Sequence, residues 1–251
     1  MAVILELKDV TKAYDAYKVV DGFNFQVEEG ELRCLLGPNG AGKTTTIDLV
    51  TGRQKATSGT ITFDGRPITG MREDKIAKRG VGRKFQVPAV FKDLTVRDNL
   101  RVAFNRNTDP FANMIRFGRE EGRERLQQVV ELTGLQDRLD ELGGNLSHGE
   151  TQWLEIGMVL TQNPKLLLMD EPTAGMTEQE TQKTSEIFNR LKGDHTLIVV
   201  EHDMAFVREI ADVITLMHLG KTLAEGPMEV VENDPKVKEV YLGSEGITDA
   251  A

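Results

Sequence analysis

The segment Gly37-Pro-Asn-Gly-Ala-Gly-Lys-Thr44 constrains the fold of this chain more than any other part of the sequence. It fits the pattern G-x-x-x-x-G-K-[ST] at every fixed position. It follows the largely apolar run Glu31–Leu36, which predicts a strand, and a helix is expected to begin at Lys43. Glycines allow backbone N–H groups to turn inward around phosphate oxygens, and a helix N-terminus adds partial positive charge. The segment therefore predicts a phosphate-binding loop between a strand and a helix.

The residues of this loop have different expected roles in binding a nucleoside triphosphate. Lys43 is expected to reach the β- and γ-phosphates, and the Thr44 hydroxyl is expected to ligate Mg²⁺. An accidental glycine-rich turn is the alternative explanation, and the strand–loop–helix setting argues against it. The candidate nucleotide-binding residues here are Gly37, Pro38, Asn39, Gly40, Ala41, Gly42, Lys43, Thr44 and Thr45.

A second, largely apolar run, Leu166–Glu171, predicts a buried strand that ends in two adjacent carboxylates, Asp170 and Glu171. Adjacent strand residues point to opposite sides, so the two carboxylates can act separately. We expect Asp170 to orient the ligands of Mg²⁺ and Glu171 to accept a proton from the attacking water. An Asp-Glu pair alone is usually a solvated strand end or a helix cap, but the phosphate loop favours the catalytic interpretation.

The order of patterns along the chain indicates an α/β fold interrupted by helices. Residues 95–160 have a mostly helical pattern, whereas short apolar runs alternate with helical stretches after Pro164. Strands that alternate with helices imply a parallel sheet covered on both faces. We predict one domain over residues 1–251, with an α/β core at 1–86 and 164–251 and a helical subdomain at 87–163.

Composition excludes several classes of protein. The chain is 39% hydrophobic and 28% charged, as is typical of globular proteins, and its apolar runs are far shorter than the roughly 18 residues of a membrane helix. The N-terminal residues lack the pattern of a signal peptide, so a cytoplasmic location is expected. The net charge of −9 argues against a nucleic-acid partner. The single cysteine, Cys34, excludes an internal disulfide and is expected to be a small core residue.

Further segments resemble the ATP-binding-cassette (ABC) ATPases. Leu146-Ser-His-Gly-Glu150 is similar to the signature motif Leu-Ser-Gly-Gly-Gln and precedes Asp170 at the spacing of that family. Gln86 matches the Q-loop glutamine, His202 matches the switch histidine, and Tyr14 matches the aromatic residue that stacks on adenine. The resemblance covers essentially the whole chain. It implies a P-loop NTPase (RecA-like) core with an antiparallel β subdomain and an inserted α-helical subdomain.

The resemblance also implies roles for these residues. Gln86 would sense the metal and the attacking water, and His202 would contact the γ-phosphate. Tyr14 is favoured over Tyr17 as the adenine platform, although either could be ordinary packing. The expected metal ligands are Thr44, Gln86 and Asp170, and the expected catalytic residues are Lys43, Gln86, Glu171 and His202.

The signature residues imply a dimer, because in this family they serve the ATP that is bound by the opposite subunit. Ser147 and Gly149 would bind that ATP, and the active unit would be a head-to-tail dimer with two nucleotides at its interface. A plain helix cap is the alternative for Ser147, and both roles can hold together. The sequence departs from the family pattern at His148, Glu150 and Trp153, and in the stretch Thr173–Met176, followed by Thr177, where the family has Ser-Ala-Leu-Asp. We expect hydrolysis to be retained and assign no role to Thr177.

The chain resembles the separate ATPase subunits of bacterial importers. Ala174-Gly175 and residues 240–243 are similar to the branched-chain amino-acid importer group. Within that group, residues 82–86, 146–149, 153–158 and 174–176 are most similar to the urea-importer subunit. The resemblance implies ATP and Mg²⁺ as cofactors and a location on the cytoplasmic face of the plasma membrane. The implied partners are two integral-membrane permeases, a second identical or unlike ABC ATPase subunit, and a periplasmic or extracellular substrate-binding protein.

Residues 87–95 are the expected surface for coupling to a permease, with Val90 and Phe91 either exposed to a permease helix or packed internally. The predicted cargo is urea or a similar small amide or amino acid. The alternatives are a branched-chain amino-acid importer, a lipopolysaccharide exporter and a soluble ABC protein that acts on DNA or ribosomes. A non-catalytic scaffold is the least favoured alternative.

Overall fold

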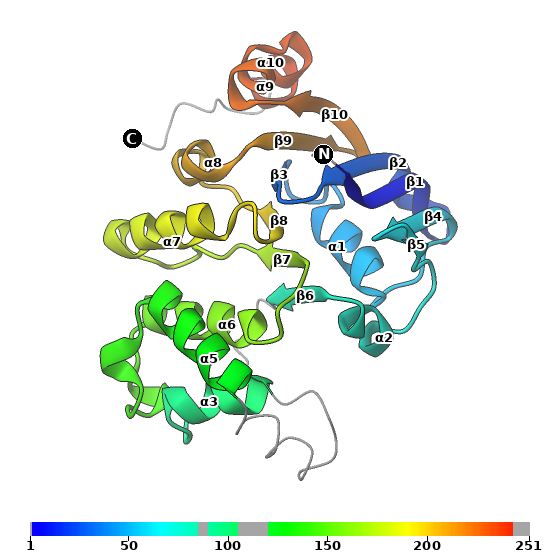
Figure 1. The fold of residues 1–251 in the computed structure, drawn as a ribbon. Coiled ribbons are helices and arrows are strands. Elements are labelled where there is room, and N and C mark those ends of the chain that lie inside the picture. The colour runs from blue at the N-terminus through cyan, green and yellow to red at the C-terminus, as the bar shows by residue number, and fades with distance from the viewer. Residues whose placement is uncertain (1, 85–89, 105–119, 243–251) are drawn as a thin grey trace. The chain divides into compact units, whose positions relative to one another are not determined.

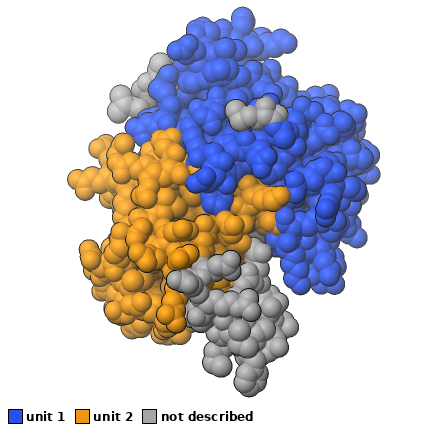
Figure 2. All heavy atoms as spheres, in the orientation of Figure 1, with its two compact units in different colours: residues 1–79, 192–251 blue, residues 80–191 orange. Residues whose placement is uncertain are grey.

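The computed structural model describes residues 2–84, 90–104 and 120–242. The chain divides into two compact units, one formed by Met1–Arg79 with Lys192–Ala251 and the other by Gly80–Leu191 (Figure 2). The α/β fold class expected from the sequence is confirmed, with one antiparallel sheet, parallel strand pairs and several helices. The functional boundaries at residues 86/87 and 163/164 stay a prediction. No helix in the described ranges is long and apolar enough to cross a membrane.

The antiparallel sheet of the first unit contains four strands, β1 (Val3–Tyr14), β2 (Tyr17–Glu28), β4 (Ser58–Phe63) and β5 (Arg66–Pro67). Their order is β2-β1-β4-β5 (Figure 1). Residue Leu5 of β1 faces Val27 on one neighbour and Phe63 on the other, and all three are buried. Alternation along these strands places their apolar side chains on one face, which forms the core of this sheet.

The other strands of this unit have the order β10-β9-β3-β8. Strand β3 (Leu32–Leu36) pairs in parallel with β8 (Thr196–Val200) on one side and with β9 (Val213–His218) on the other. Strand β10 (Lys221–Gly226) is antiparallel to β9. Every residue of β3 and β8 is buried, as expected for near-continuous apolar runs in a parallel sheet.

Cys34 lies in the middle of β3 and is fully buried. Burial raises the pKa of its thiol, and the Glu201 carboxylate raises it further. The expectation of a small core residue is therefore confirmed.

The helices of the first unit are α1 (Lys43–Thr51), α2 (Glu73–Lys78), α8 (Met204–Ile210), α9 (Met228–Asn233) and α10 (Pro235–Leu242). Helix α1 begins at Lys43, within the glycine-rich loop, and is followed by the capping residue Gly52, whose φ of 76° is left-handed. Helix α8 begins after Asp203, whose carboxylate accepts hydrogen bonds from the backbone N–H groups of Ala205 and Phe206 at 2.9 and 3.1 Å. Side-chain caps of this kind satisfy donors that a helix leaves without partners.

The second unit combines two parallel strands, β6 (Val81–Lys84) and β7 (Leu166–Asp170), with four α-helices among its described residues. The helices are α3 (Val96–Phe104), α5 (Glu120–Thr133), α6 (His148–Leu160) and α7 (Glu178–Leu191). Short 3₁₀ turns occupy Gln136–Arg138 and Gly143–Asn145. Helices α3 and α5 pack on α6, where a Cβ added at Gly157 would lie 3.2 Å from both Leu100 and Val129 (Figure 1).

The contribution of the Asp203 cap to the stability of α8 can be tested by replacing its side chain. We expect Asp203→Ala to lower the free energy of unfolding by about 1 kcal/mol, because two helix N–H groups lose their acceptor. Asp203→Asn keeps a side-chain oxygen and should cost much less. Urea denaturation of the two variants measures the difference, and equal losses would contradict the capping explanation.

Candidate functional site

The glycine-rich loop lies between β3 and α1, as the sequence predicted. Gly37 and Gly42 have φ angles of 149° and 104°, in a region that favours glycine. A Cβ added at Gly37 would lie 2.3 Å from the Met217 carbonyl oxygen, and one added at Gly42 would lie 2.7 Å from the Val19 carbonyl oxygen. These two glycines therefore allow the loop to pack directly on neighbouring backbone.

Lys43 is only 7% exposed, and its ammonium group is held within the loop. Its Nζ donates to the carbonyl oxygens of Gly37 at 2.6 Å and Pro38 at 3.1 Å. Thr44 is exposed in the first turn of α1, and Thr45 is half-buried. An ammonium group beside a helix N-terminus, with a hydroxyl next to it, is suited to binding phosphate.

Tyr14 and Tyr17 lie opposite each other at the turn between β1 and β2. The Tyr14 hydroxyl donates to Gln54, which in turn donates to Asp48 at 2.9 Å. The Lys12 ammonium lies 4.8 Å from the centre of the Tyr14 ring. Tyr14 is 48% exposed and Tyr17 is 63% exposed. The anchored hydroxyl and the accessible ring favour Tyr14 as the stacking residue, which stays a prediction.

Asp170 and Glu171 lie in different environments. The cause is not that neighbouring residues of one strand point to opposite faces, because only Asp170 belongs to the strand. Asp170 is the last residue of β7 and is 2% exposed, with its Oδ2 3.8 Å from Nη2 of Arg83 on β6. Glu171 follows the strand, is half-buried and has a left-handed φ of 49°. The expectation that both residues would lie in an extended strand was therefore wrong for Glu171. A left-handed backbone costs free energy at a residue other than glycine, and active sites are one place where such strained residues cluster.

His202 follows β8 and has an exposed side chain. Its backbone N–H donates to the Glu201 carboxylate at 3.0 Å, and the next residue, Asp203, caps α8. The predicted Q-loop residue Gln86 lies outside the described residues, as do residues 87–89 of the expected coupling surface.

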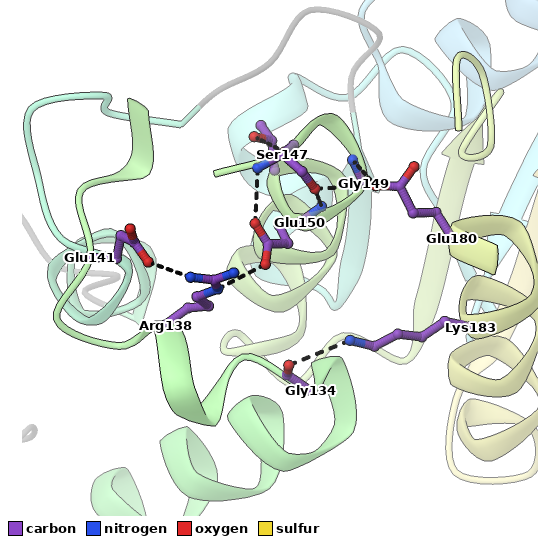
Figure 3. A network of polar contacts seen from close by, with 9 residues as sticks. Gly134, Arg138, Glu141, Ser147, Gly149, Glu150, Glu180 and Lys183 are labelled. Carbon is purple, nitrogen blue, oxygen red and sulfur yellow. Dashed lines mark hydrogen bonds and ion pairs between the residues drawn. The ribbon is translucent and has the colours of Figure 1, made fainter. Parts of the chain in front are cut away.

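Ser147 forms the N-cap of α6 in a capping box with Glu150 (Figure 3). The Ser147 hydroxyl accepts from the Glu150 N–H at 3.1 Å, and the Glu150 carboxylate accepts from the Ser147 N–H at 2.9 Å. Arg138 donates to the same carboxylate at 2.9 Å. The cap expected as an alternative for Ser147 is thus present. The departure at Glu150 is explained because a carboxylate can both cap the helix and bind Arg138.

The Glu180 carboxylate lies against the two signature residues that were expected to bind phosphate (Figure 3). Its Oε1 accepts from the Ser147 hydroxyl and from the Gly149 N–H, each at 3.1 Å. A Cβ added at Gly149 would lie 2.3 Å from this oxygen, so the contact requires glycine. Glu180 was missed from the sequence. The spacing Thr177-x-x-Glu180 before a helix, which is typical of a capping box, was the available signal.

The other oxygen of Glu180 is bound by Thr177. Oε2 accepts from the N–H and from the hydroxyl of Thr177, both at 3.0 Å. These donors, with Thr177 first, lower the pKa of Glu180 below its ordinary value, although partial burial opposes them. The carboxylate is therefore ionised at neutral pH.

The departures at His148 and Trp153 connect α6 with the segment around α7. The His148 Nε2 lies 2.9 Å from the Ala174 carbonyl oxygen. Trp153 is buried, its indole N–H donates to the Thr184 hydroxyl at 3.0 Å, and the Lys183 ammonium lies 3.7 Å from the centre of its ring. Burial lowers the pKa of Lys183. Both departures therefore have packing roles within the second unit.

The oxygen donors expected to hold Mg²⁺ suit that ion. Thr44 presents an exposed hydroxyl at the first turn of α1, and Asp170 is a buried carboxylate at the end of β7. Magnesium is usually bound by one or two carboxylates or hydroxyls together with phosphate oxygens and water. Within the described ranges no group of three or more His, Cys, Asp or Glu side chains gathers to hold a metal.

Matches to family models and to known proteins all indicate the same family. Residues 20–174 match the model of the ABC transporter family, and residues 221–247 match that of the branched-chain amino acid ATP-binding cassette transporters. The chain is 36% identical over 250 residues to the high-affinity branched-chain amino acid transport ATP-binding protein BraF of Pseudomonas aeruginosa, covering 96% of this chain and 98% of BraF. It is 33% identical over 249 residues to LivG of Escherichia coli K12, covering 96% and 98% of the two chains.

A solved structure supports the same family. The crystal structure of an ABC transporter's ATP-binding cassette in its ADP conformation has a TM-score of 0.85 and 31% identity, covering 97% of this chain and all of that one. The chain therefore belongs to the ABC transporter family, as an ATP-binding subunit that hydrolyses ATP. Within the family it falls in the group of the branched-chain amino acid transport ATP-binding proteins BraF and LivG.

The expected contact of the Lys43 ammonium group with phosphate can be tested by measuring nucleotide binding. We expect Lys43→Ala to weaken ATP binding by at least about tenfold, because a charge-assisted contact to phosphate contributes more than about 1.5 kcal/mol. Isothermal titration calorimetry measures the affinity. Lys236→Ala, which removes an exposed lysine from α10, is the matched control. An affinity that is unchanged in both variants would contradict the assignment of the loop.

Proposed function

We propose that this chain drives an importer: it binds ATP with Mg²⁺, hydrolyses it in a head-to-tail dimer, and powers uptake of a small nitrogen-containing solute. The observation that carries the proposal is that the Ser147 hydroxyl and the Gly149 N–H both donate to one anionic oxygen, that of Glu180, so these two signature residues can bind an anion. The second support is the glycine-rich loop, within which the Lys43 ammonium group is held by the carbonyl oxygens of Gly37 and Pro38. In the proposed dimer, the loop of one subunit and the signature residues of the other subunit bind the phosphates of the same ATP.

The residues of the proposed ATPase site have separate tasks. Lys43 and the loop N–H groups hold the phosphates, and Tyr14 stacks on the adenine. Glu171 accepts the proton of the attacking water, while His202 and Gln86 contact the γ-phosphate region. Thr44, Asp170 and Gln86 hold Mg²⁺. When bound, the metal neutralises charge on the phosphate oxygens.

The coupling surface is proposed on the segment before α3. Phe91 is 50% exposed, and its backbone N–H and C=O are both bound to the Asn99 side chain, at 2.8 and 3.0 Å. Val90 is half-buried, and a Cβ added at Gly143 would lie 2.7 Å from its Cγ1. Of the two apolar side chains, Phe91 is thus the one presented to a permease helix. Val90 packs internally, the alternative left open by the sequence.

The proposed assembly contains two permeases, a second cassette that is identical or unlike, and a substrate-binding protein outside the membrane. The chain would be bound to the cytoplasmic face of that membrane, with no nucleic-acid partner. Two cargoes are supported by different observations. Residues 82–86, 146–149, 153–158 and 174–176 resemble the urea-importer subunit, whereas the relatives BraF and LivG are named branched-chain amino acid transport ATP-binding proteins. Lipid export is a weaker candidate, because only a general resemblance of the group favours it.

Replacement of Glu171 tests the proposed base. We expect Glu171→Gln to reduce the ATP turnover rate by about 10²-fold or more while the affinity for ATP stays unchanged, because the amide cannot accept the proton. Steady-state phosphate release and calorimetry measure the two quantities. Glu229→Gln, at an exposed position in α9, is the control for the loss of one carboxylate. Unchanged turnover in Glu171→Gln would contradict the assignment.

The transport proposal is tested by capture from native membranes with the tagged Glu171→Gln chain, ATP and Mg²⁺, with Lys43→Ala as the control. We expect two unlike integral-membrane proteins and a second cassette to be recovered. The captured complex, with the wild-type chain restored, is then placed in vesicles and supplied with labelled urea or leucine. Uptake of either solute identifies the cargo. Recovery of lipid-export components, or of ribosomal or DNA-repair proteins alone, would contradict the importer.

A further inference from the structure

The Glu180 carboxylate occupies the hydrogen-bond donors that the proposed function assigns to a partner's ATP. The Ser147 hydroxyl and the Gly149 N–H both donate to Oε1. These two donors come from the first turn of α6, whereas Glu180 comes from the first turn of α7, 33 residues after Ser147 (Figure 3). The acceptor at the signature motif is therefore supplied by the chain itself.

Hydrogen bonds hold both oxygens of the Glu180 carboxylate. Oε1 is bound by the signature donors and Oε2 is bound twice by Thr177. The Glu180 N–H also donates to the Thr177 hydroxyl at 3.3 Å, which completes a reciprocal capping arrangement at the start of α7. The Glu180 side chain is thus held at Gly149 by four hydrogen bonds rather than by one chance contact.

A carboxylate and a phosphate cannot share these donors. The Gly149 N–H and the Ser147 hydroxyl each carry one hydrogen, and each can donate one strong hydrogen bond. The two anions would also repel each other at this distance. Binding of a phosphate at Ser147 and Gly149 therefore requires the Glu180 carboxylate to move away from these two donors.

We propose that Glu180 is an internal stand-in for the γ-phosphate: it occupies the signature donors when the chain is alone and is displaced by the ATP of the partner cassette as the dimer closes. This inference rests on the proposed head-to-tail dimer. The contact satisfies the signature donors in the separated subunit and raises the ATP concentration that closure requires. Thr177, which has no role assigned from the sequence, hydrogen-bonds Glu180 at the start of α7 and so keeps this residue near the signature donors, ready to return when the phosphate leaves.

The experiment measures ATP-driven dimerisation of the full chain in the Glu171→Gln background, by sedimentation velocity over a range of ATP concentrations with Mg²⁺. We expect Glu180→Gln to lower the ATP concentration for half-maximal dimer about tenfold, which corresponds to about 1.4 kcal/mol. The amide is uncharged and competes less well with phosphate for the two donors. Thr177→Ala, which weakens the other end of the contact, should shift the midpoint in the same direction by a smaller factor.

Glu178→Gln is the matched control, because it removes the same charge from the same turn of α7 at an exposed position. Binding of a fluorescent ATP analogue to the monomer should be equal in all variants. A midpoint that is unchanged or raised in Glu180→Gln, with lower thermal stability, would show a purely structural cap and overturn the inference. A chain that binds ATP but forms no dimer in any variant, the Glu171→Gln parent included, would instead contradict the proposed function itself.

Discussion

The parallel pairing of β3 on both of its edges is the constraint on which the nucleotide-binding residues of the first unit depend. Because β8 and β9 hydrogen-bond β3 from either side and all five of its residues are buried, its carboxyl end is fixed. The glycine-rich loop begins there, and His202 follows the carboxyl end of the neighbouring β8. Parallel strands bring their carboxyl ends to one edge of a sheet, where ligands of open α/β folds bind. Gly37 then allows the loop to lie against the β9 backbone at Met217.

In the second unit, the signature residues are positioned by the N-termini of helices rather than by the ends of strands. Helices α6 and α7 each begin in a capping arrangement that combines a hydroxyl with a glutamate, Ser147 with Glu150 and Thr177 with Glu180. The second of these glutamates reaches across to the first helix at Gly149. Local stabilisation of two helix ends thus produces the anion-binding geometry of the signature motif.

Much of this organisation could be predicted from the sequence, because it depends on local patterns. Apolar runs identified β3, β7 and β8, and the glycine spacing identified the loop before α1. The antiparallel sheet followed only from the resemblance to ABC ATPases. Glu180 was missed, since its contacts with Ser147 and Gly149 span more than thirty residues and no local pattern specifies them. The backbone at Glu171 was also missed, because strand alternation says nothing about a residue that lies just beyond the strand.

The burial of Cys34 has a practical consequence for following this protein in motion. The chain's one thiol lies inside β3, where burial raises its pKa and keeps it from forming the reactive thiolate. Maleimide labels will therefore pass over the native cysteine in the folded chain. A pair of cysteines introduced on exposed positions can carry spectroscopic probes without first removing Cys34 from the core. Distances between such probes, both placed within one compact unit, would then report conformational change in that unit during turnover.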